Sequence, residues 1–181
     1  MTATRAQFRE ELTFTRPLSR ETDAHRTRRQ DVDEDSKGVH WAATREPHPA
    51  REAALASISA VARGAKDEWV ALFASDGVVE DPVGPSVFDP EGLGHHGREG
   101  IAAFWDLAIA QADRIEFHID DSFAAGREVA NVGRVTTFLP DGNAMDAEGV
   151  FVYRVDDVGL ILSMRAFWEF DRAMATIRQA N

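Results

Sequence analysis

Apolar residues recur with the period of an α-helix in three stretches between residues 49 and 110. The first set is Ala53, Ala54, Ile58, Val61 and Ala62, and Gly64 is expected to end this helix. A shorter helix follows, with acidic residues in its first turn and with Trp69, Leu72 and Phe73 on one face. Ser75-Asp76-Gly77 is expected to break it. The third set is Ile101, Phe104, Trp105, Ala108 and Ile109, which has the spacing of an amphipathic helix.

After residue 113 the helical period gives way to alternation. Ile115, Phe117 and Ile119 alternate with polar residues, which predicts a strand with one buried face. Further strands are predicted at 129–139, 145–155 and 160–170, with turn sequences at 140–143 and 156–159, and residues 171–179 are expected to form a short helix or extension. Helices followed by antiparallel hairpins indicate an α+β fold, in which three N-terminal helices cover one curved antiparallel sheet and leave a pocket between the layers.

Residues 1–47 differ from the rest in composition. Arginine and acidic residues alternate densely between Arg26 and Asp35, and apolar residues are too few to bury a face. Such a segment does not offset the entropy cost of ordering. We therefore expect a charged, mostly disordered tail at 1–47, with a transient helix near residues 6–12, and one folded domain at 48–181. Two interpretations of the tail stay open: an interaction arm, or a dispensable extension that includes an unused upstream start site.

The overall charge excludes several classes of partner. The chain has a formal net charge of −11 and a pI near 4.9, and such a surface repels the phosphates of nucleic acids and anionic membranes.

The composition and the N-terminus limit the chemistry and the location. The chain has no cysteine, which excludes disulfides, thiol nucleophiles and thiolate metal sites. The N-terminus has charges where a signal peptide has its apolar core, and no stretch reaches the roughly 20 apolar residues of a membrane span. We therefore expect a soluble, cytoplasmic protein.

The candidate chemistry begins at the end of a strand. Val78-Val79-Glu80-Asp81 is typical of a strand that Pro82 ends, because proline fixes φ and has no N–H for the ladder. This arrangement places the Asp81 carboxylate at the rim of whatever the strand lines. The loop that follows, at 82–97, is rich in proline and glycine and is either a flap over a pocket opening or a surface insertion.

Two motifs resemble the steroid Δ-isomerases (ketosteroid isomerases) of the nuclear transport factor 2-like, or SnoaL-like, superfamily. They are Val-Glu-Asp-Pro-Val-Gly at 79–84 and Gly-Arg-Glu-Gly-Ile-Ala-Ala-Phe at 97–104, and the match in order covers roughly residues 50 to 170. The resemblance implies a cone-shaped sheet around an apolar pocket, a homodimer and no cofactor. It also implies that Asp81 is a general base, which takes a proton from the carbon next to a ketone and returns it two carbons along.

The same resemblance shows where this chain departs from the family pattern. The tyrosine and the aspartate that would donate hydrogen bonds to the enolate oxygen fall at Ser57 and Phe151. Two supporting tyrosines fall at Phe73 and Trp105, and of the four replacements only Ser57 and Trp105 can still donate. Losing such donors costs several kcal/mol of transition-state stabilisation. Isomerisation by the usual hydrogen-bond network is therefore not expected.

Other side chains could donate in their place or line the pocket. Tyr153, the only tyrosine, is expected to face the pocket, where its phenol could donate to an enolate oxygen. Arg134, on the neighbouring strand, could pair with the base or bind an anionic substrate. Met164 and Trp168 alternate on the last strand and would form an apolar surface for a flat polycyclic ligand. The competing roles are a solvent-facing sheet residue for Tyr153 and Arg134, and core packing for Met164 and Trp168.

The remaining motifs point to no metal or cofactor. His95-His96 are adjacent, so their side chains diverge, and no acidic or histidine spacing around them resembles a metal site. There is no phosphate loop, nucleophile elbow or dinucleotide-binding motif. We therefore expect neither a metal nor a cofactor.

The sequence thus predicts a steroid Δ-isomerase-like enzyme that acts on a small hydrophobic ketone, steroid or polyketide-like. Its expected catalytic residues are Asp81, Tyr153 and Ser57. One alternative is a polyketide cyclase or an epoxide hydrolase of the same fold, although the Arg-x-Asp pair of limonene-type hydrolases appears here as Arg134-Val135-Thr136, without the acid. The other alternative is a non-catalytic protein that binds hydrophobic ligands.

Overall fold

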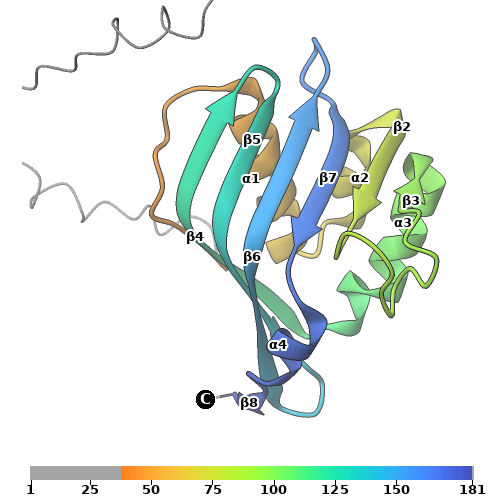
Figure 1. Ribbon diagram of the computed structural model, residues 1–181, viewed down its shortest axis with the longest axis vertical. Coiled ribbons are helices and arrows are strands. Elements are labelled where there is room, and N and C mark those ends of the chain that lie inside the picture. Colours follow the sequence, from red (N-terminus) through yellow and green to blue (C-terminus); the bar gives the residue numbers. More distant parts are fainter. Residues whose placement is uncertain (1–37, 181) are drawn as a thin grey trace, which may run out of the picture. The chain divides into compact units, whose positions relative to one another are not determined.

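An eight-stranded sheet forms the body of the protein in the computed structural model, which describes residues 38–180 (Figure 1). Its strands are β1 (Val39–Trp41), β2 (Phe73–Glu80), β3 (His95–His96), β4 (Arg114–Ala125), β5 (Glu128–Phe138), β6 (Asn143–Val155), β7 (Ile161–Phe167) and β8 (Arg178–Gln179). The strand order is β1-β4-β5-β6-β7-β2-β3, with β8 paired to β6.

The sheet is mixed in direction. β1 runs parallel to β4 and β2 runs parallel to β7, while the other neighbours are antiparallel. The predicted α+β class is confirmed, but the purely antiparallel sheet is wrong. Hairpin turns impose antiparallel pairing on β4 to β7, whereas β1 and β2 reach their partners through long connections that permit parallel pairing.

The helices are α1 (Pro49–Ala62), α2 (Lys66–Ala71), α3 (Gly97–Leu107) and α4 (Phe170–Met174), and a 3-10 turn, η1 (Ile109–Gln111), follows α3. In residues 38–180 only α1 and α3 are substantial, so the prediction of three covering helices is wrong: α2 has six residues. Phe73, which the apolar pattern placed in that helix, instead begins β2. Ser75-Asp76-Gly77 belongs to the same strand, where the register with β7 shifts between Phe73 and Val78.

Local sequence explains both ends of α1. Pro49 occupies its first position, and the His48 side chain accepts a hydrogen bond from the N–H of Ala50. At the other end Gly64 has a φ of +68°, the left-handed conformation that favours glycine after a helix. Figure 1 shows α1 behind β4, β5 and β6, against which it packs.

The sheet extends further toward the N-terminus than the predicted domain boundary at residue 48. Strand β1 lies within the segment that we assigned to a charged tail, and its Val39 and Trp41 are buried against Ile58 of α1. Three residues of alternation are too few to stand out in a sequence. The predicted disorder is therefore wrong for β1, and the rest of it, with the transient helix near residues 6–12, falls on residues 1–37, outside the described part of the chain.

Two glycines allow the long strands to curve over the helices. Gly133 and Gly149 are opposite each other in the pairing of β5 with β6. A Cβ on Gly133 would lie 2.1 Å from the carbonyl oxygen of His118, and one on Gly149 would lie 2.2 Å from that of Phe167. Only glycine permits so close an approach of neighbouring backbones, so the bend of the sheet depends on these two positions.

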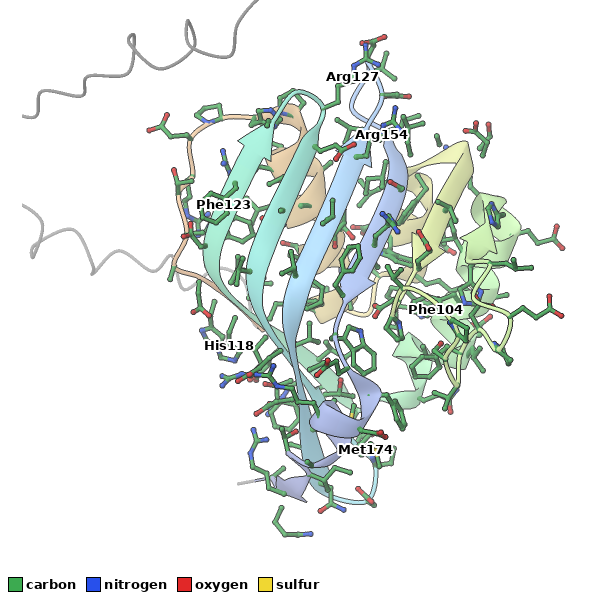
Figure 2. All side chains as sticks on the ribbon, viewed as in Figure 1. Phe104, His118, Phe123, Arg127, Arg154 and Met174 are labelled. Carbon is green, nitrogen blue, oxygen red and sulfur yellow. The ribbon has the colours of Figure 1, made fainter. Side chains whose placement is uncertain are left out.

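The two faces of the sheet have different side chains. The face toward the helices holds the core, in which the buried side chains include Trp69, Phe73, Val79, Ile101, Phe104, Val155 and Ile161. The open face, turned toward the viewer in Figure 2, leaves Phe123, Val132 and Phe167 exposed.

Among the described helices, none combines the length and the apolar character needed to cross a membrane.

Candidate functional site

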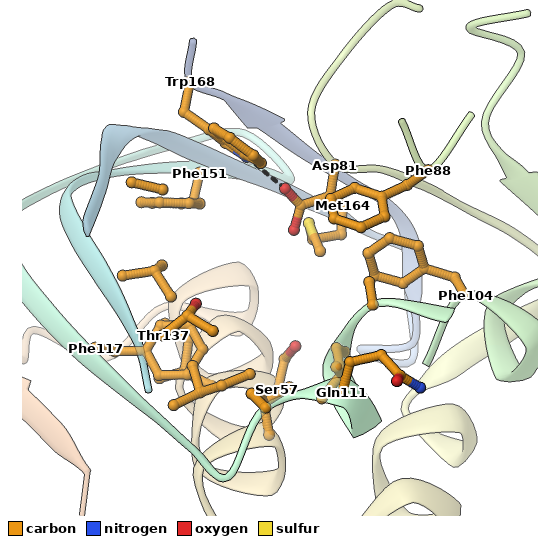
Figure 3. A pocket seen from close by; sticks show the side chains of 18 of the residues that line it. Ser57, Asp81, Phe88, Phe104, Gln111, Phe117, Thr137, Phe151, Met164 and Trp168 are labelled. Atoms are coloured by element: carbon orange, nitrogen blue, oxygen red, sulfur yellow. Dashed lines mark hydrogen bonds between the residues drawn. The ribbon is translucent and has the colours of Figure 1, made fainter. Parts of the chain in front are cut away.

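A cavity of about 330 Å³ lies between the helices and the sheet (Figure 3). Most of its lining is apolar and comes from Ile58, Val61, Phe88, Phe104, Ile109, Ile115, Phe117, Val135, Phe151, Met164 and Phe170. Polar atoms come from Ser57, Asp81, Gln111, Thr137 and Tyr153, together with the indoles of Trp69 and Trp168. The cavity agrees with the predicted apolar pocket, and a few polar groups in such a lining are typical of a small-molecule site.

Strand β2 ends at Glu80 and places the next residue, Asp81, at the cavity (Figure 3). The indole N–H of Trp168 donates a hydrogen bond to Oδ1 of Asp81 at 2.6 Å. Burial raises the pKa of Asp81 to about 6, and the Trp168 hydrogen bond opposes that rise because it favours the charged form. Glu80 instead pairs with Arg165 at 2.6 Å. Of the two adjacent acidic residues, only Asp81 lines the apolar cavity.

A chain of hydrogen-bonding groups runs from α2 through α1 to β6. The indole N–H of Trp69 donates to Oγ of Ser57 at 2.9 Å, and Ser57 Oγ lies 3.4 Å from the phenol oxygen of Tyr153. Because Ser57 already accepts from Trp69, its own proton is available to Tyr153. The phenol proton of Tyr153 is then available to a ligand in the cavity.

The phenol of Tyr153 stays neutral over the physiological range. Burial raises its pKa to about 12, the nearby negative charge of Asp81 adds to the rise, and the Ser57 hydrogen bond opposes it. The cavity therefore holds one acid that ionises near pH 6 and one phenol that keeps its proton. These are the properties of a base and of a hydrogen-bond donor.

The predicted apolar and aromatic site residues divide into two groups. Phe151, Met164 and Trp168 line the cavity together with Asp81. Phe73 and Trp105 do not: they are buried beside Trp69, with ring centroids 5.0 Å and 5.4 Å from its indole. Direct ligand contact is therefore not supported for these two, and they hold in place the indole that donates to Ser57.

Arg134 lies on the sheet face opposite the cavity, so its predicted orientation is wrong. Strand β5 pairs it with Glu148, and its neighbour Val135 is the residue that lines the cavity. Its Nε lies 3.9 Å from Oδ1 of Asp146. Side chains alternate along a strand, so an error of one residue in the assumed register reverses the face.

The loop after Asp81 contributes a residue that sequence reasoning missed. Phe88 lines the cavity and packs edge-to-face on Phe104, with 6.3 Å between ring centroids. The Asp89 carboxylate fixes the loop, because it accepts hydrogen bonds from the N–H groups of Gly92 and Gly94. An aromatic residue inside a Pro- and Gly-rich loop is the signal that could have identified Phe88. The contact of Phe88 with Phe104 is what the predicted flap over the cavity requires.

Comparisons with known proteins identify a family and several similar solved structures. The SnoaL-like domain matches residues 54–164. RV0760c from Mycobacterium tuberculosis is 33% identical, with a TM-score of 0.67 over 75% of this chain and 98% of that one. The same protein in complex with estradiol-17β-hemisuccinate is 34% identical, with a TM-score of 0.66 over 73% and 99% of the two chains.

Two further solved structures are similar over most of their length. A Δ5-3-ketosteroid isomerase from Mycobacterium sp. is 35% identical, with a TM-score of 0.66 over 73% of this chain and 98% of that one. A computationally designed 17-OHP binder is 30% identical, with a TM-score of 0.65 over 75% and 99% of the two chains. A search of curated protein sequences found no match.

Proposed function

We propose that the protein shifts a double bond in a hydrophobic, steroid-like ketone without a cofactor. The chain belongs to the SnoaL-like family and is similar to a ketosteroid isomerase, which supports this proposal. The observation that supports this most is the Asp81 carboxylate, which has a pKa of about 6 in an apolar cavity. A carboxylate with this pKa is ionised at neutral pH, and once protonated it readily returns the proton.

In the proposed reaction Asp81 takes a proton from the carbon next to the ketone. The electron pair of the broken C–H bond forms a dienolate, whose oxygen becomes negative. Asp81 then returns the proton two carbons along, and the double bond ends conjugated with the ketone. Trp168 keeps the carboxylate oriented through its indole hydrogen bond, which leaves Oδ2 for the proton transfer.

Tyr153 is the proposed donor to the dienolate oxygen. Two of the four donors expected in the family are phenylalanines here, Phe151 and Phe73. Tyr153 can replace them because Ser57 and Trp69 leave its phenol proton available on the cavity side. A donor already aimed at the developing charge stabilises it without reorganisation.

The apolar lining supports a hydrophobic ligand. The cavity volume of about 330 Å³ lies at the lower end of the range of about 300–1,000 Å³ for small-molecule sites. A steroid ester binds to the similar RV0760c. The epoxide hydrolase alternative loses support, because Arg134 lies outside the cavity.

The direct test is incubation with 5-androstene-3,17-dione while the absorbance of the conjugated enone is followed. Turnover supports the isomerase. Tight steroid binding without turnover favours the second candidate, a non-catalytic binding protein, for which the replaced donors Phe151 and Phe73 are the specific evidence. If the protein neither turns over nor binds the steroid, the cyclase or hydrolase alternative is favoured.

The pH dependence provides a second prediction. We expect kcat/KM of the isomerisation to rise with pH and to reach half its plateau at pH about 6, because Asp81 acts only when ionised. Trp168→Phe removes a hydrogen bond that favours the charged form, so the midpoint should move to higher pH. Trp105→Phe is the matched control, since this buried tryptophan does not line the cavity. A midpoint that falls, or that moves equally in both variants, would contradict the assignment.

We also propose a homodimer that forms through the open face of the sheet. Val132, Val150 and Phe167 are neighbours across β5, β6 and β7, and Phe123 beside them is 61% exposed. Light scattering coupled to size exclusion should give twice the chain mass of 20.0 kDa. Phe167→Glu should produce monomers, because a two-fold interface would bury the new charge twice, whereas Val158→Glu in the β6–β7 turn should not. A monomeric wild-type protein would rule the dimer out.

A further inference from the structure

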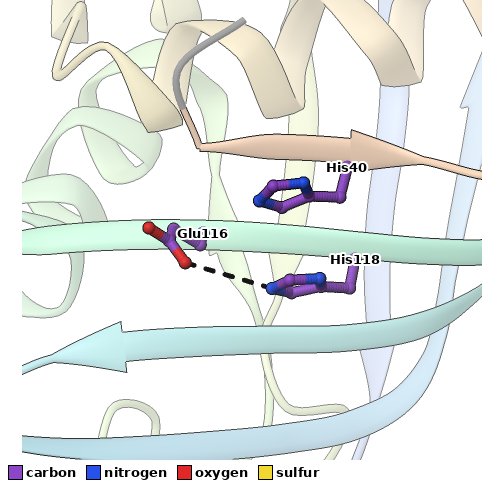
Figure 4. A group of neighbouring side chains, drawn as sticks. All are labelled: His40, Glu116 and His118. Carbon is purple, nitrogen blue, oxygen red and sulfur yellow. Dashed lines mark ion pairs between the residues drawn. The ribbon is translucent and has the colours of Figure 1, made fainter. Parts of the chain in front are cut away.

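Three side chains able to bind a metal meet on the open face of the sheet (Figure 4). Glu116 and His118 are two residues apart on β4, so they project from the same face. The edge strand β1 pairs in parallel with β4 and brings His40 directly opposite His118. The cluster is separate from the cavity, because the residue between Glu116 and His118, Phe117, lines the cavity from the other face.

The ligand atoms are near one another but farther apart than around a bound ion. One ligand atom from each residue lies within 4.8 Å of the other two. Nε2 of His118 lies 4.0 Å from Oε2 of Glu116, and the two imidazole rings stack with 4.5 Å between centroids. Ligand atoms about 2.0–2.1 Å from a tetrahedral Zn²⁺ lie about 3.3 Å apart. The side chains must therefore close by about 1.5 Å, and the rings must turn so that their nitrogen lone pairs converge. His40 is exposed and has room to turn.

Charges of both signs surround the cluster. Arg134 of β5 is the cross-strand neighbour of His118, and its Nε lies 3.9 Å from Asp146 of β6, which also pairs with Arg178 at 2.9 Å. Arg114 of β4 lies 3.2 Å from Glu116 on the exposed side. An imidazole binds a metal ion in its neutral form.

We propose that His40, Glu116 and His118 bind a divalent transition-metal ion, for which Zn²⁺ is the best fit, with water as the fourth ligand. Two imidazoles and one carboxylate are a ligand set that zinc accepts. This proposal differs from our sequence-based expectation of no metal, which considered only His95-His96. A bound ion would join β1 to β4 and fix the edge strand, independently of any reaction in the cavity.

The test uses the full chain without an affinity tag, freed of metal with EDTA and titrated with ZnCl₂ by calorimetry. We expect one Zn²⁺ per chain and a higher unfolding temperature in zinc. Each of His40→Ala, Glu116→Gln and His118→Ala should weaken zinc binding by about tenfold or more, because each removes one ligand. The control His96→Ala changes an exposed histidine at the start of α3 and should leave the affinity unchanged. Co²⁺ in place of Zn²⁺ should give the visible absorption of a four-coordinate site.

Two results would overturn the proposal. One is the absence of saturable zinc binding. The other is binding that survives His40→Ala and His118→Ala together, because the ion would then be held elsewhere, for example by His25 or His48. Circular dichroism and steroid affinity should be unchanged in the variants, which separates loss of a ligand from loss of the fold. If His118→Ala unfolds, the exposed edge-strand variant His40→Gln provides the same test.

Discussion

Asp81→Asn is expected to lower kcat for the isomerisation of 5-androstene-3,17-dione by about 100- to 10,000-fold, the usual contribution of a positioned general base. The amide keeps the shape of the side chain and can still accept the hydrogen bond from Trp168, but it cannot take a proton. The matched control is Glu80→Gln, which changes the adjacent acid that pairs with Arg165 outside the cavity lining. Equal losses in the two variants, or an unchanged rate in Asp81→Asn, would exclude Asp81 as the base.

The stability of the same variant separates lost chemistry from lost structure. The folded-state pKa of Asp81 is raised from 3.8 to about 6, so ionisation destabilises the folded state as the pH rises from the lower value through the higher one. Above pH 6 this cost is present in full, and asparagine removes it. We therefore expect urea denaturation at pH 8 to show a free energy of unfolding higher by on the order of 1 kcal/mol. A marked decrease would mean that the variant loses activity through misfolding.

Tyr153→Phe is expected to lower kcat by about 100- to 1,000-fold, the typical cost of removing one donor to an oxyanion. Its ring fills the same volume, so steroid affinity should change much less than the rate. Thr137→Val is the matched control, because it removes a different hydroxyl from the cavity lining. Steady-state kinetics and equilibrium binding of a steroid enone should be measured together.

The pattern of losses distinguishes the alternatives for Tyr153. If Tyr153→Phe lowers steroid affinity and leaves kcat unchanged, the phenol contributes to ligand binding and not specifically to the transition state. If it changes neither, another group must stabilise the dienolate, and the relay from Trp69 through Ser57 is structural. The neutral phenol, with its pKa of about 12, should make this effect independent of pH between 6 and 9.

Local sequence determined the class of the fold and the position of its central acid. Alternation at Ile115, Phe117 and Ile119 marked a strand with one buried face, and helical spacing marked α1 and α3. The Asp81-Pro82 pair ended β2 where the sequence placed its end. These features could be predicted because propensity, alternation and chain-breaking residues act within a few residues of each other.

Tertiary structure decided what depends on pairing between distant segments. Only the register of β5 on β6 turned Arg134 away from the cavity, and only the packing of α2 on α1 brought Trp69 to Ser57. The parallel pairing of β1 with β4 placed His40 opposite His118, although 77 residues of the chain lie between them. No local sequence pattern predicts these contacts between distant residues, because strand register and helix packing are set by the burial of whole faces. A shift of one residue in register exchanges one face of a strand for the other.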